Sequence, residues 1–114
     1  MLERAIEVAR GNTIKKLPKM GAILLTKGGN VYYGINRYRT HPLQKKFGRN
    51  RNSVYLHAEI DAIVKAMRYE KSIMGARLYV ARVLKNGRPA LAKPCPGCQR
   101  AIMAFRIGKV EWTE

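Results

Sequence analysis

The sequence has little negative charge, few residues that bind metals, and no long apolar segment. Its 114 residues include seven Asp and Glu against 23 Lys and Arg, with two histidines and two cysteines. A membrane-spanning helix needs about 18 or more apolar residues in a row, and the chain has no such run. Its first residues are amphipathic and charged, unlike a secretory signal peptide. Two cysteines cannot supply a disulfide framework, so we expect a cytoplasmic protein rather than a disulfide-rich secreted domain.

The formal charge of +16 is unevenly distributed along the chain. A field of this sign attracts polyanions and raises their association rate, but it says little about the fold. The partner could be a nucleotide phosphate, single-stranded nucleic acid, or RNA bound without sequence preference. A composition set by solubility or genome bias would give the same charge. No acidic residue occurs from Val8 to Ala58, a stretch that contains Arg10, Lys15, Lys16, Lys19, Lys27, Arg37, Arg39, Lys45, Lys46, Arg49 and Arg51.

The scarce residue types gather in two short motifs. Residues 57–59 (His-Ala-Glu) contain one of the two histidines, and residues 94–98 (Pro-Cys-Pro-Gly-Cys) contain both cysteines. One imidazole and two thiolates make a zinc site with three protein ligands and one open position. That arrangement is typical of catalytic zinc, because structural sites close with four protein ligands. We therefore expect one Zn2+ per chain, held by His57, Cys95 and Cys98.

Both motifs are expected at helix N-termini. Residues 55–67 are alanine-rich with apolar residues at helical spacing, which predicts a buried helix. Positions i and i+2 of a helix point about 200° apart, so His57 and Glu59 can address one metal only beyond the first turn. Prolines at positions 94 and 96 suit the beginning of a helix, which places Cys95 and Cys98 at the N-terminus of a helix through residues 99–106. A helix N-terminus lowers the pKa of a thiol, and zinc binds the thiolate.

The pattern H-x-E…P-C-x-x-C is the signature of zinc-dependent nucleobase deaminases. Through residues 57–59 and 94–98 the chain resembles the cytidine/deoxycytidylate deaminase superfamily. That group also holds tRNA adenosine deaminases, guanine deaminases and polynucleotide cytidine deaminases. The resemblance implies a zinc-dependent hydrolase in which water attacks the amino-bearing carbon of the base. It assigns Glu59 the transfer of protons from that water to the ring nitrogen and to the departing ammonia.

Two other interpretations of the motifs stay open. A lone C-x-x-C could be a redox pair, although the preceding sequence lacks the strand and the tryptophan expected there. His41 could also join His57 and the two cysteines as the fourth ligand of a structural zinc, which would leave Glu59 without a role. Otherwise His41 is a loop residue or a substrate contact.

Strands and helices alternate along the chain after a first helix. This order predicts one α/β domain over residues 1–114. The resemblance implies a cytidine deaminase-like three-layer sandwich, with a mixed sheet (a hairpin plus parallel strands) flanked by helices. We expect a helix over 2–9, strands over 21–26 and 31–35, a long basic loop over 37–53, the helix over 55–67, a strand over 77–83, the cysteine helix, and a strand over 110–112. A loop as long as 37–53 is usually functional or disordered, and we expect it to face the substrate.

Family members usually continue past the position of Trp112 with a further helix and often another strand. The sequence here has a short C-terminus by that measure. A sheet edge or helix face left exposed there would need a partner, so we expect a homo-oligomer.

The resemblance also implies where a nucleotide binds. It places Asn36, at the end of the second hairpin strand, on the sugar and base, although an asparagine there could simply form a turn. It places the backbone N–H of Ala58 on the base carbonyl, and Ala22 at the floor of the pocket. Arg37 and Arg39 are expected to hold phosphate, because guanidinium groups match phosphate oxygens.

Two departures from the family bear on the substrate. In free deoxycytidylate deaminases the asparagine is usually followed by a Gly-x-Pro-type turn, which residues 37–42 lack. Polynucleotide cytidine deaminases usually carry an aromatic residue just before the Pro-Cys segment, where this chain has Ala92 and Lys93. Any stacking on a base must then come from Tyr38, Tyr55 or Phe105.

The leading hypothesis is zinc-dependent deamination of a cytidine or deoxycytidine nucleotide, of the dCMP type, to its uracil form. The long segment between Asn36 and His57 fits that branch better than the short one of tRNA adenosine deaminases. The alternative is a cytosine deaminase that acts on single-stranded DNA or RNA, which the charge and the tyrosines favour. A third hypothesis is a non-catalytic, basic nucleic-acid-binding module with structural zinc.

Overall fold

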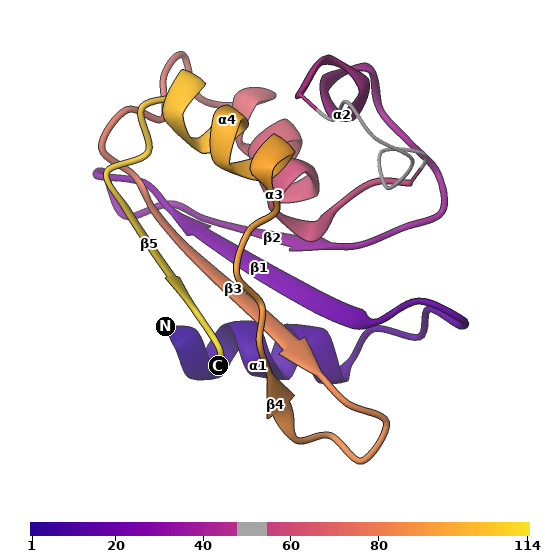
Figure 1. Ribbon diagram of the computed structural model, residues 1–114. Coiled ribbons are helices and arrows are strands. Elements are labelled where there is room, and N and C mark those ends of the chain that lie inside the picture. Colours follow the sequence, from indigo (N-terminus) through magenta and orange to yellow (C-terminus); the bar gives the residue numbers. More distant parts are fainter. Residues whose placement is uncertain (48–54) are drawn as a thin grey trace.

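The computed structural model describes residues 1–47 and 55–114. Figure 1 shows α1 on one face of a sheet and α2, α3 and α4 on the other, which confirms the three-layer α/β sandwich. The elements in chain order are α1 (Leu2–Arg10), β1 (Lys19–Leu25), β2 (Val31–Ile35), α2 (Pro42–Phe47), α3 (Ala58–Met67), β3 (Arg77–Val83), β4 (Pro89–Ala90), α4 (Pro96–Ala104) and β5 (Lys109–Trp112). No helix in these two ranges has the length and apolar character needed to cross a bilayer.

The sheet is mixed, as expected. β1 lies between β2 and β3 and pairs antiparallel with both, so the hairpin of β1 and β2 continues directly into β3. The far side of β3 is shared by the two-residue β4, antiparallel, and by β5, parallel. Among the described strands, β3 and β5 form the one parallel pair.

Alternation along the strands divides the buried residues between the two faces of the sheet. The face toward α1 is built from Ala5 and Ala9 of the helix and from Ile23, Tyr79, Ala81 and Val83 of the strands. The opposite face carries the larger core, to which α3 and α4 contribute Ile60, Ile63, Ala101 and Ile102 against Ala22, Leu24, Leu78 and Val80. Because α3 and α4 share this face, the motifs that open the two helices are brought to the same side of the sheet.

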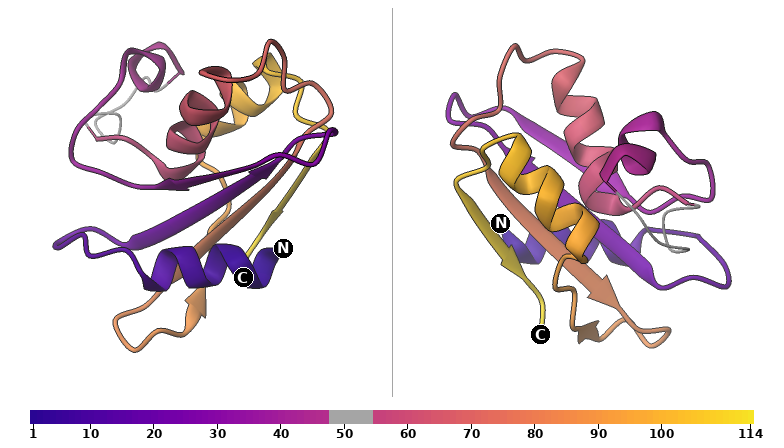
Figure 2. Two further views of the ribbon diagram at one scale, coloured as in Figure 1. Left: turned by 180° about the vertical axis from the view of Figure 1, so that it is seen from behind. Right: turned by 45° about the horizontal axis from the view of Figure 1, so that its top comes forward.

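A glycine in β2 sets how closely α3 approaches the sheet. A Cβ atom on Gly34 would lie 2.2 Å from the carbonyl oxygen of Ala58 and 2.6 Å from the amide nitrogen of Ala62. Those are backbone atoms of α3, so a larger residue could be accommodated only by moving the helix. Figure 2 shows α3 lying against the sheet in both orientations. Gly34 therefore fixes the first turn of the helix that carries Glu59.

The strand expected over 21–26 is Lys19–Leu25, and the cysteine helix ends at Ala104 rather than near 106. Two larger differences from the expected boundaries have local reasons. The expected loop over 37–53 contains a helix at 42–47: Pro42 occupies its first position, and the ring Nδ1 of His41 accepts the N–H of Leu43 at 3.0 Å. Residues 48–54, which include Arg49 and Arg51, lie outside the described residues. The helix expected over 55–67 begins only at Ala58, because Leu56 forms a two-bond bridge with Arg37 instead.

Candidate metal centre

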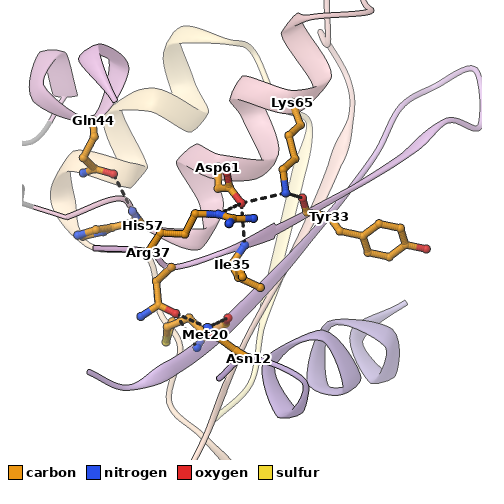
Figure 3. A network of polar contacts seen from close by, with 10 residues as sticks. Asn12, Met20, Tyr33, Ile35, Arg37, Gln44, His57, Asp61 and Lys65 are labelled. Atoms are coloured by element: carbon orange, nitrogen blue, oxygen red, sulfur yellow. Dashed lines mark hydrogen bonds and ion pairs between the residues drawn. The ribbon is translucent and has the colours of Figure 1, made fainter. Parts of the chain in front are cut away.

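His57 is the N-cap of α3, and several contacts fix its backbone. Its φ and ψ angles of −80° and 152° are extended, so the chain turns into the helix directly after it. Its N–H donates to the side-chain oxygen Oε1 of Gln44 at 3.0 Å, and Figure 3 shows this bond arriving from α2. The bridge between Leu56 and Arg37 ties the preceding residue to the end of β2. Contacts from α2 and from the segment that follows β2 therefore fix the position of His57.

The two cysteines occupy the corresponding place in α4. Cys95 is the N-cap, with φ and ψ of −67° and 165°, and Pro96 takes the first helical position, where its missing N–H costs nothing. Cys98 lies one turn later, and its N–H donates to the sulfur of Cys95 at 3.5 Å. A C-x-x-C segment at a helix start thus turns both sulfurs toward the same point.

The three predicted ligands meet. The Nδ1 atom of His57 lies 3.5 Å from the sulfur of Cys95 and 3.4 Å from the sulfur of Cys98, and all three donor atoms lie within 4.8 Å of one another. A tetrahedral zinc with bonds of about 2.3 Å to sulfur and about 2.0 Å to nitrogen would separate such donors by roughly 3.5 Å. The donor set and its spacing therefore fit zinc.

Within residues 1–47 and 55–114, no other His, Cys, Asp or Glu joins this cluster. His41, the fourth ligand of the structural-zinc alternative, uses its Nδ1 atom to accept the N–H of Leu43 within its own turn. Three protein ligands and no fourth is the pattern of a catalytic zinc site.

The two thiols have opposite electrostatic environments. The neighbouring Cys98 thiol, by hydrogen bonding to Cys95, lowers the pKa of Cys95 to about 3, and the ring of His57 acts in the same direction. The same bond and burial raise the pKa of Cys98. Since zinc binds thiolates, metal binding requires both sulfurs to be deprotonated.

Glu59 lies in the first turn of α3 and is 4% exposed. Burial raises the pKa of its carboxyl group, whereas a backbone hydrogen bond and the nearby ring of His57 act in the opposite direction. Glu59 is not part of the ligand cluster. It is a buried acid beside the metal ligands, with no structural need to bind the ion itself.

A cavity of about 180 Å³ opens beside the ligands. The ring of Tyr55 stacks on the ring of His57 with a centroid distance of 5.0 Å and covers one side of it. The cavity is lined by Pro18, Met20, Asn36, Tyr55, His57, Ala58, Glu59, Lys93 and Cys95. It is a small site with few polar groups, among them a carboxylate, an amide and one lysine.

The sequence model described as "Cytidine and deoxycytidylate deaminase zinc-binding region" matches residues 1–114. The chain belongs to this deaminase family. The expected cofactor Zn2+ is thereby confirmed, and His57, Cys95 and Cys98 form a group that could hold it. Comparison with curated protein sequences finds no match.

Solved structures agree with the family. The dCMP deaminase of the cyanophage S-TIM5 superposes with a TM-score of 0.69 at 26% identity, over 97% of this chain and 77% of that one. The structure of that enzyme in complex with dCMP and dUMP gives a TM-score of 0.68 at 23% identity, over 97% and 76% of the two chains. Cytidine deaminase from Burkholderia pseudomallei gives 0.64 at 20% identity, over 96% and 80%. The cytidine deaminase-like fold predicted from the sequence is confirmed.

The substrate contacts expected of a deaminase are only partly gathered at the cavity. Asn36 and Ala58 line it, but Ala22 is fully buried in the core and is not among its lining residues. Asn36 is 2% exposed and much of its amide is already used. Its oxygen accepts from Asn12 at 2.6 Å and from the N–H of Met20 at 3.1 Å, and its nitrogen donates to the carbonyl of Pro18 at 2.7 Å. One N–H of Asn36 is left for a ligand.

The three residues that follow Asn36 lie outside the cavity lining. Arg37 turns its guanidinium toward Asp61, with Nε 3.4 Å from Oδ2. Tyr38 is 57% exposed and donates its hydroxyl to the carbonyl of Lys15, and Arg39 is exposed. Their roles in binding phosphate or stacking on a base stay predictions.

Two buried polar residues near the site lie outside the sequence motifs, and the motifs give no indication of their contacts. Gln44, 1% exposed, belongs to a segment expected to be a loop, and nothing local indicates that it reaches His57. Asp61, 5% exposed, accepts from the N–H of Ile35 at 3.0 Å and from Lys65 at 3.1 Å, as well as from Arg37 (Figure 3). The spacing of Asp61 and Lys65 by four residues could have indicated the ion pair, but not the bond that joins α3 to β2.

Proposed function

We propose that this deaminase hydrolyses the exocyclic amino group of cytosine in a cytidine or deoxycytidine nucleotide, of the dCMP type, to give the uracil form and ammonia. The observation that carries the proposal is the buried carboxylate of Glu59 in a small cavity beside three zinc ligands. A structural zinc site would have no use for a buried, desolvated acid at that place.

Glu59 is proposed to move the protons of the reaction. When bound by His57, Cys95 and Cys98, zinc supplies a Lewis acid that makes water a nucleophile near neutral pH. When a water in the cavity attacks the amino-bearing ring carbon, Glu59 would move its first proton to the ring nitrogen. It would then move the second proton from the new hydroxyl to the amino group, which leaves as ammonia. Burial suits this task, because a raised carboxyl pKa brings that group closer to the pKa values of the groups with which it exchanges protons.

The base is proposed to be held by the start of α3 and the end of β2. Ala58 is the first residue of α3, where backbone N–H groups have no partner within the helix and can meet a base carbonyl. Asn36, which has one N–H left for a ligand, lines the same cavity. Met20, Pro18 and the ring of Tyr55 supply apolar walls for a single ring.

A phosphate on the substrate fits the charge around the site. Among the described residues that line the cavity, Lys93 is the one lysine or arginine, whereas Arg37 and Arg39 lie outside the lining. Support for a nucleotide comes from the cyanophage dCMP deaminase, which was solved in complex with dCMP and dUMP. Zinc-dependent hydrolysis, a cytoplasmic setting and a homo-oligomeric assembly are part of the same proposal. The outer edges of β2 and β5 are free in the described sheet, and a second copy could cover either one.

A product assay tests this function directly. Purified protein with a measured zinc content is incubated with cytidine, dCMP, dCTP and adenosine at one salt concentration, and ammonia and the deaminated products are quantified. We expect uracil products from a cytosine nucleotide and none from adenosine. Release of inosine would overturn the proposal in favour of adenosine deamination. Absence of product from all of these compounds, with zinc at one per chain, would also overturn it.

A further inference from the structure

Asn12 is a buried polar residue that belongs to neither motif and lies between α1 and β1. It is 4% exposed, and its side-chain oxygen accepts the N–H of Ile14 at 3.0 Å. Its side-chain nitrogen donates to the carbonyl of Met20 at 3.1 Å and to the side-chain oxygen of Asn36 at 2.6 Å. Figure 3 shows Asn12 next to Met20. Met20 and Asn36 line the catalytic cavity and Asn12 does not, so Asn12 contacts the wall of the cavity from outside.

The backbone partners of Asn12 fix the orientation of its amide group. A backbone N–H can only donate a hydrogen bond, and a backbone carbonyl can only accept one. The bonds to the N–H of Ile14 and the carbonyl of Met20 are therefore compatible with a single orientation, in which the NH2 group of Asn12 also points to Asn36. A half-turn of the amide would leave these buried groups unpaired, which is unfavourable.

The amide of Asn36 is oriented in the same way. Its oxygen accepts the N–H of Met20 at 3.1 Å, and its nitrogen donates to the carbonyl of Pro18 at 2.7 Å. Together with the bond from Asn12, both lone pairs of the oxygen are in use. What remains for a ligand is one N–H of a residue that lines the cavity. Asn36 can therefore donate a hydrogen bond to a substrate but cannot accept one.

We propose that Asn12 is a positioning residue, which holds Asn36 as a hydrogen-bond donor and so makes the site select nucleotides that present an oxygen acceptor to it. That oxygen belongs to the phosphate, to a sugar hydroxyl group or to the carbonyl group of the base. Because Asn36 is oriented before the substrate arrives, binding does not have to order its side chain. The role in substrate selection rests on the proposed function, whereas the coupling of the two amides does not.

The coupling of the two amides is measured in the zinc-loaded protein without substrate. Side-chain NH2 signals of 15N-labelled protein are recorded by NMR, and the pair of Asn36 is assigned by its loss in Asn36→Ala. Asn12→Asp keeps the acceptor for Ile14 but has no N–H to donate. We expect the NH2 protons of Asn36 to exchange with solvent at least about tenfold faster in this variant. Unchanged exchange would overturn the proposal.

Asn86→Asp is the matched control. The side-chain oxygen of Asn86 accepts the N–H of Arg88 at 3.0 Å, the same bond to the second following residue that Asn12 makes, but Asn86 is exposed in the hairpin between β3 and β4. This variant should leave the exchange of Asn36 and the kinetics unchanged. Zinc content and thermal unfolding verify that each variant is folded. If Asn12→Asp does not fold, Asn12→Ser takes its place, because a serine hydroxyl can accept the same N–H of Ile14.

A double-mutant cycle tests the effect on catalysis. The ratio kcat/KM for dCMP is measured for Asn12→Asp, for Asn36→Ala and for the variant that carries both substitutions. We expect Asn12→Asp to lower kcat/KM about tenfold, and to have no further effect once Asn36 is alanine. Equal losses with and without Asn36 would show that Asn12 only stabilises the segment around it, and would overturn the positioning role.

Substrate analogues identify the acceptor. Deoxycytidine lacks the phosphate, 2′,3′-dideoxycytidine monophosphate lacks the 3′-hydroxyl group, and 2-thio-dCMP has sulfur, a weaker acceptor, in place of the carbonyl oxygen of the base. The effect of Asn12→Asp on kcat/KM should disappear with one of these analogues and persist with the other two. Persistence with all three would overturn the selection of an oxygen acceptor by Asn36.

The measurements separate this proposal from the proposed function. If the unmodified protein deaminates no cytosine nucleotide, the proposed function fails, while the exchange measurement still decides whether Asn12 holds Asn36. If dCMP is deaminated but exchange and the double-mutant cycle show no coupling, the positioning role of Asn12 alone fails.

Discussion

Two helix N-termini meet at the zinc site, and the rest of the protein holds them in different ways. α3 packs on β1 and β2, and seven of its ten residues are buried. Its first turn is tied down by the bond from His57 to Gln44 and by the bonds from β2 to Asp61. α4 packs chiefly against α2 and α3. Apart from the contacts of both sulfurs with His57 at the metal site, the hydrogen bonds of its first turn stay within residues 94–99.

The difference indicates that the fold positions one half of the site and that zinc positions the other half. The histidine and the catalytic acid are placed by the sheet, so they should keep their positions without zinc. The cysteines sit on a segment that is anchored mainly at its C-terminal end, where Gly75 and Gly108 bond to Arg106 and Ala76. Zinc is then what fixes the first turn of α4. The predictions below test this contrast, beginning with the largest expected effect.

Removal of zinc should loosen α4 far more than α3. Zinc binding to sites of this kind contributes strongly to folding, so chelation should lower the hydrogen-exchange protection of the first turn of α4 by about 100-fold, or roughly 3 kcal/mol. Amides in the middle of α3 should change much less. Cys98→Ser should reproduce the effect without a chelator. Equal loss of protection in the two helices would contradict the division between fold and metal.

Gly34→Ala should displace the histidine half of the site. The added Cβ would meet backbone atoms of α3 at 2.2 Å and 2.6 Å, so the helix must move, at a cost of about 3 kcal/mol. Urea unfolding measures the loss of stability, and zinc titration measures the loss of affinity. Gly28→Ala is the control, since its Cβ would meet only the hydroxyl of Thr26 at 3.9 Å. Similar stabilities for the two variants would mean that α3 is not held by close packing on β2.

Asp61→Asn should weaken the attachment of α3 to β2 by about 2 kcal/mol, because the hydrogen bonds from Lys65, Arg37 and the N–H of Ile35 lose their charged acceptor. Chemical denaturation at low salt measures this loss. Glu3→Gln is a control on an exposed carboxylate and should change stability by less than about 0.5 kcal/mol. Equal effects of the two substitutions would show that Asp61 does not hold α3 on β2.

Gln44→Met should give the smallest of these effects, a weaker binding of zinc by His57. The substitution keeps the size of the side chain but removes the acceptor for the N–H of His57, which should lower zinc affinity by about tenfold. Lys45→Met changes an exposed neighbour on the same helix and should leave zinc affinity unchanged. Competition with a colorimetric chelator gives both affinities, and identical values would show that Gln44 does not orient the ligand.

The parts of the molecule that could be predicted from the sequence depend on local patterns. The run of residues 77–83 between Gly75 and the turn at 85–88 predicted β3 over its full length. The spacing of the motifs predicted that His57, Cys95 and Cys98 would meet at two helix N-termini. These features follow from side-chain periodicity, from the effect of proline on helix starts, and from the donor preference of zinc.

The parts that could not be predicted depend on contacts between distant segments. α2 forms inside a basic segment without helical periodicity, and its one buried side chain, Gln44, matters because it reaches His57 thirteen positions later. Asn12 and Asn36 lie 24 positions apart, and the side-chain N–H of Asn12 donates to the side-chain oxygen of Asn36. Nothing in the sequence indicates that this oxygen has a protein partner and is not available to a substrate. A hollow of about 690 Å³ is lined by residues 14–19 and residues 82–85, which no window of sequence brings together.

The most direct test of the catalytic site uses Glu59→Gln, which keeps the size and hydrogen-bonding capacity of the side chain but cannot accept the proton. The variant is purified in parallel with the unmodified protein, and zinc per chain and turnover of dCMP are measured on the same samples. We predict one zinc per chain in both proteins, and a turnover in the variant lower by at least about 100-fold. Loss of zinc from the variant, or turnover close to that of the unmodified protein, would contradict the assignment of Glu59 as the acid beside a three-ligand zinc.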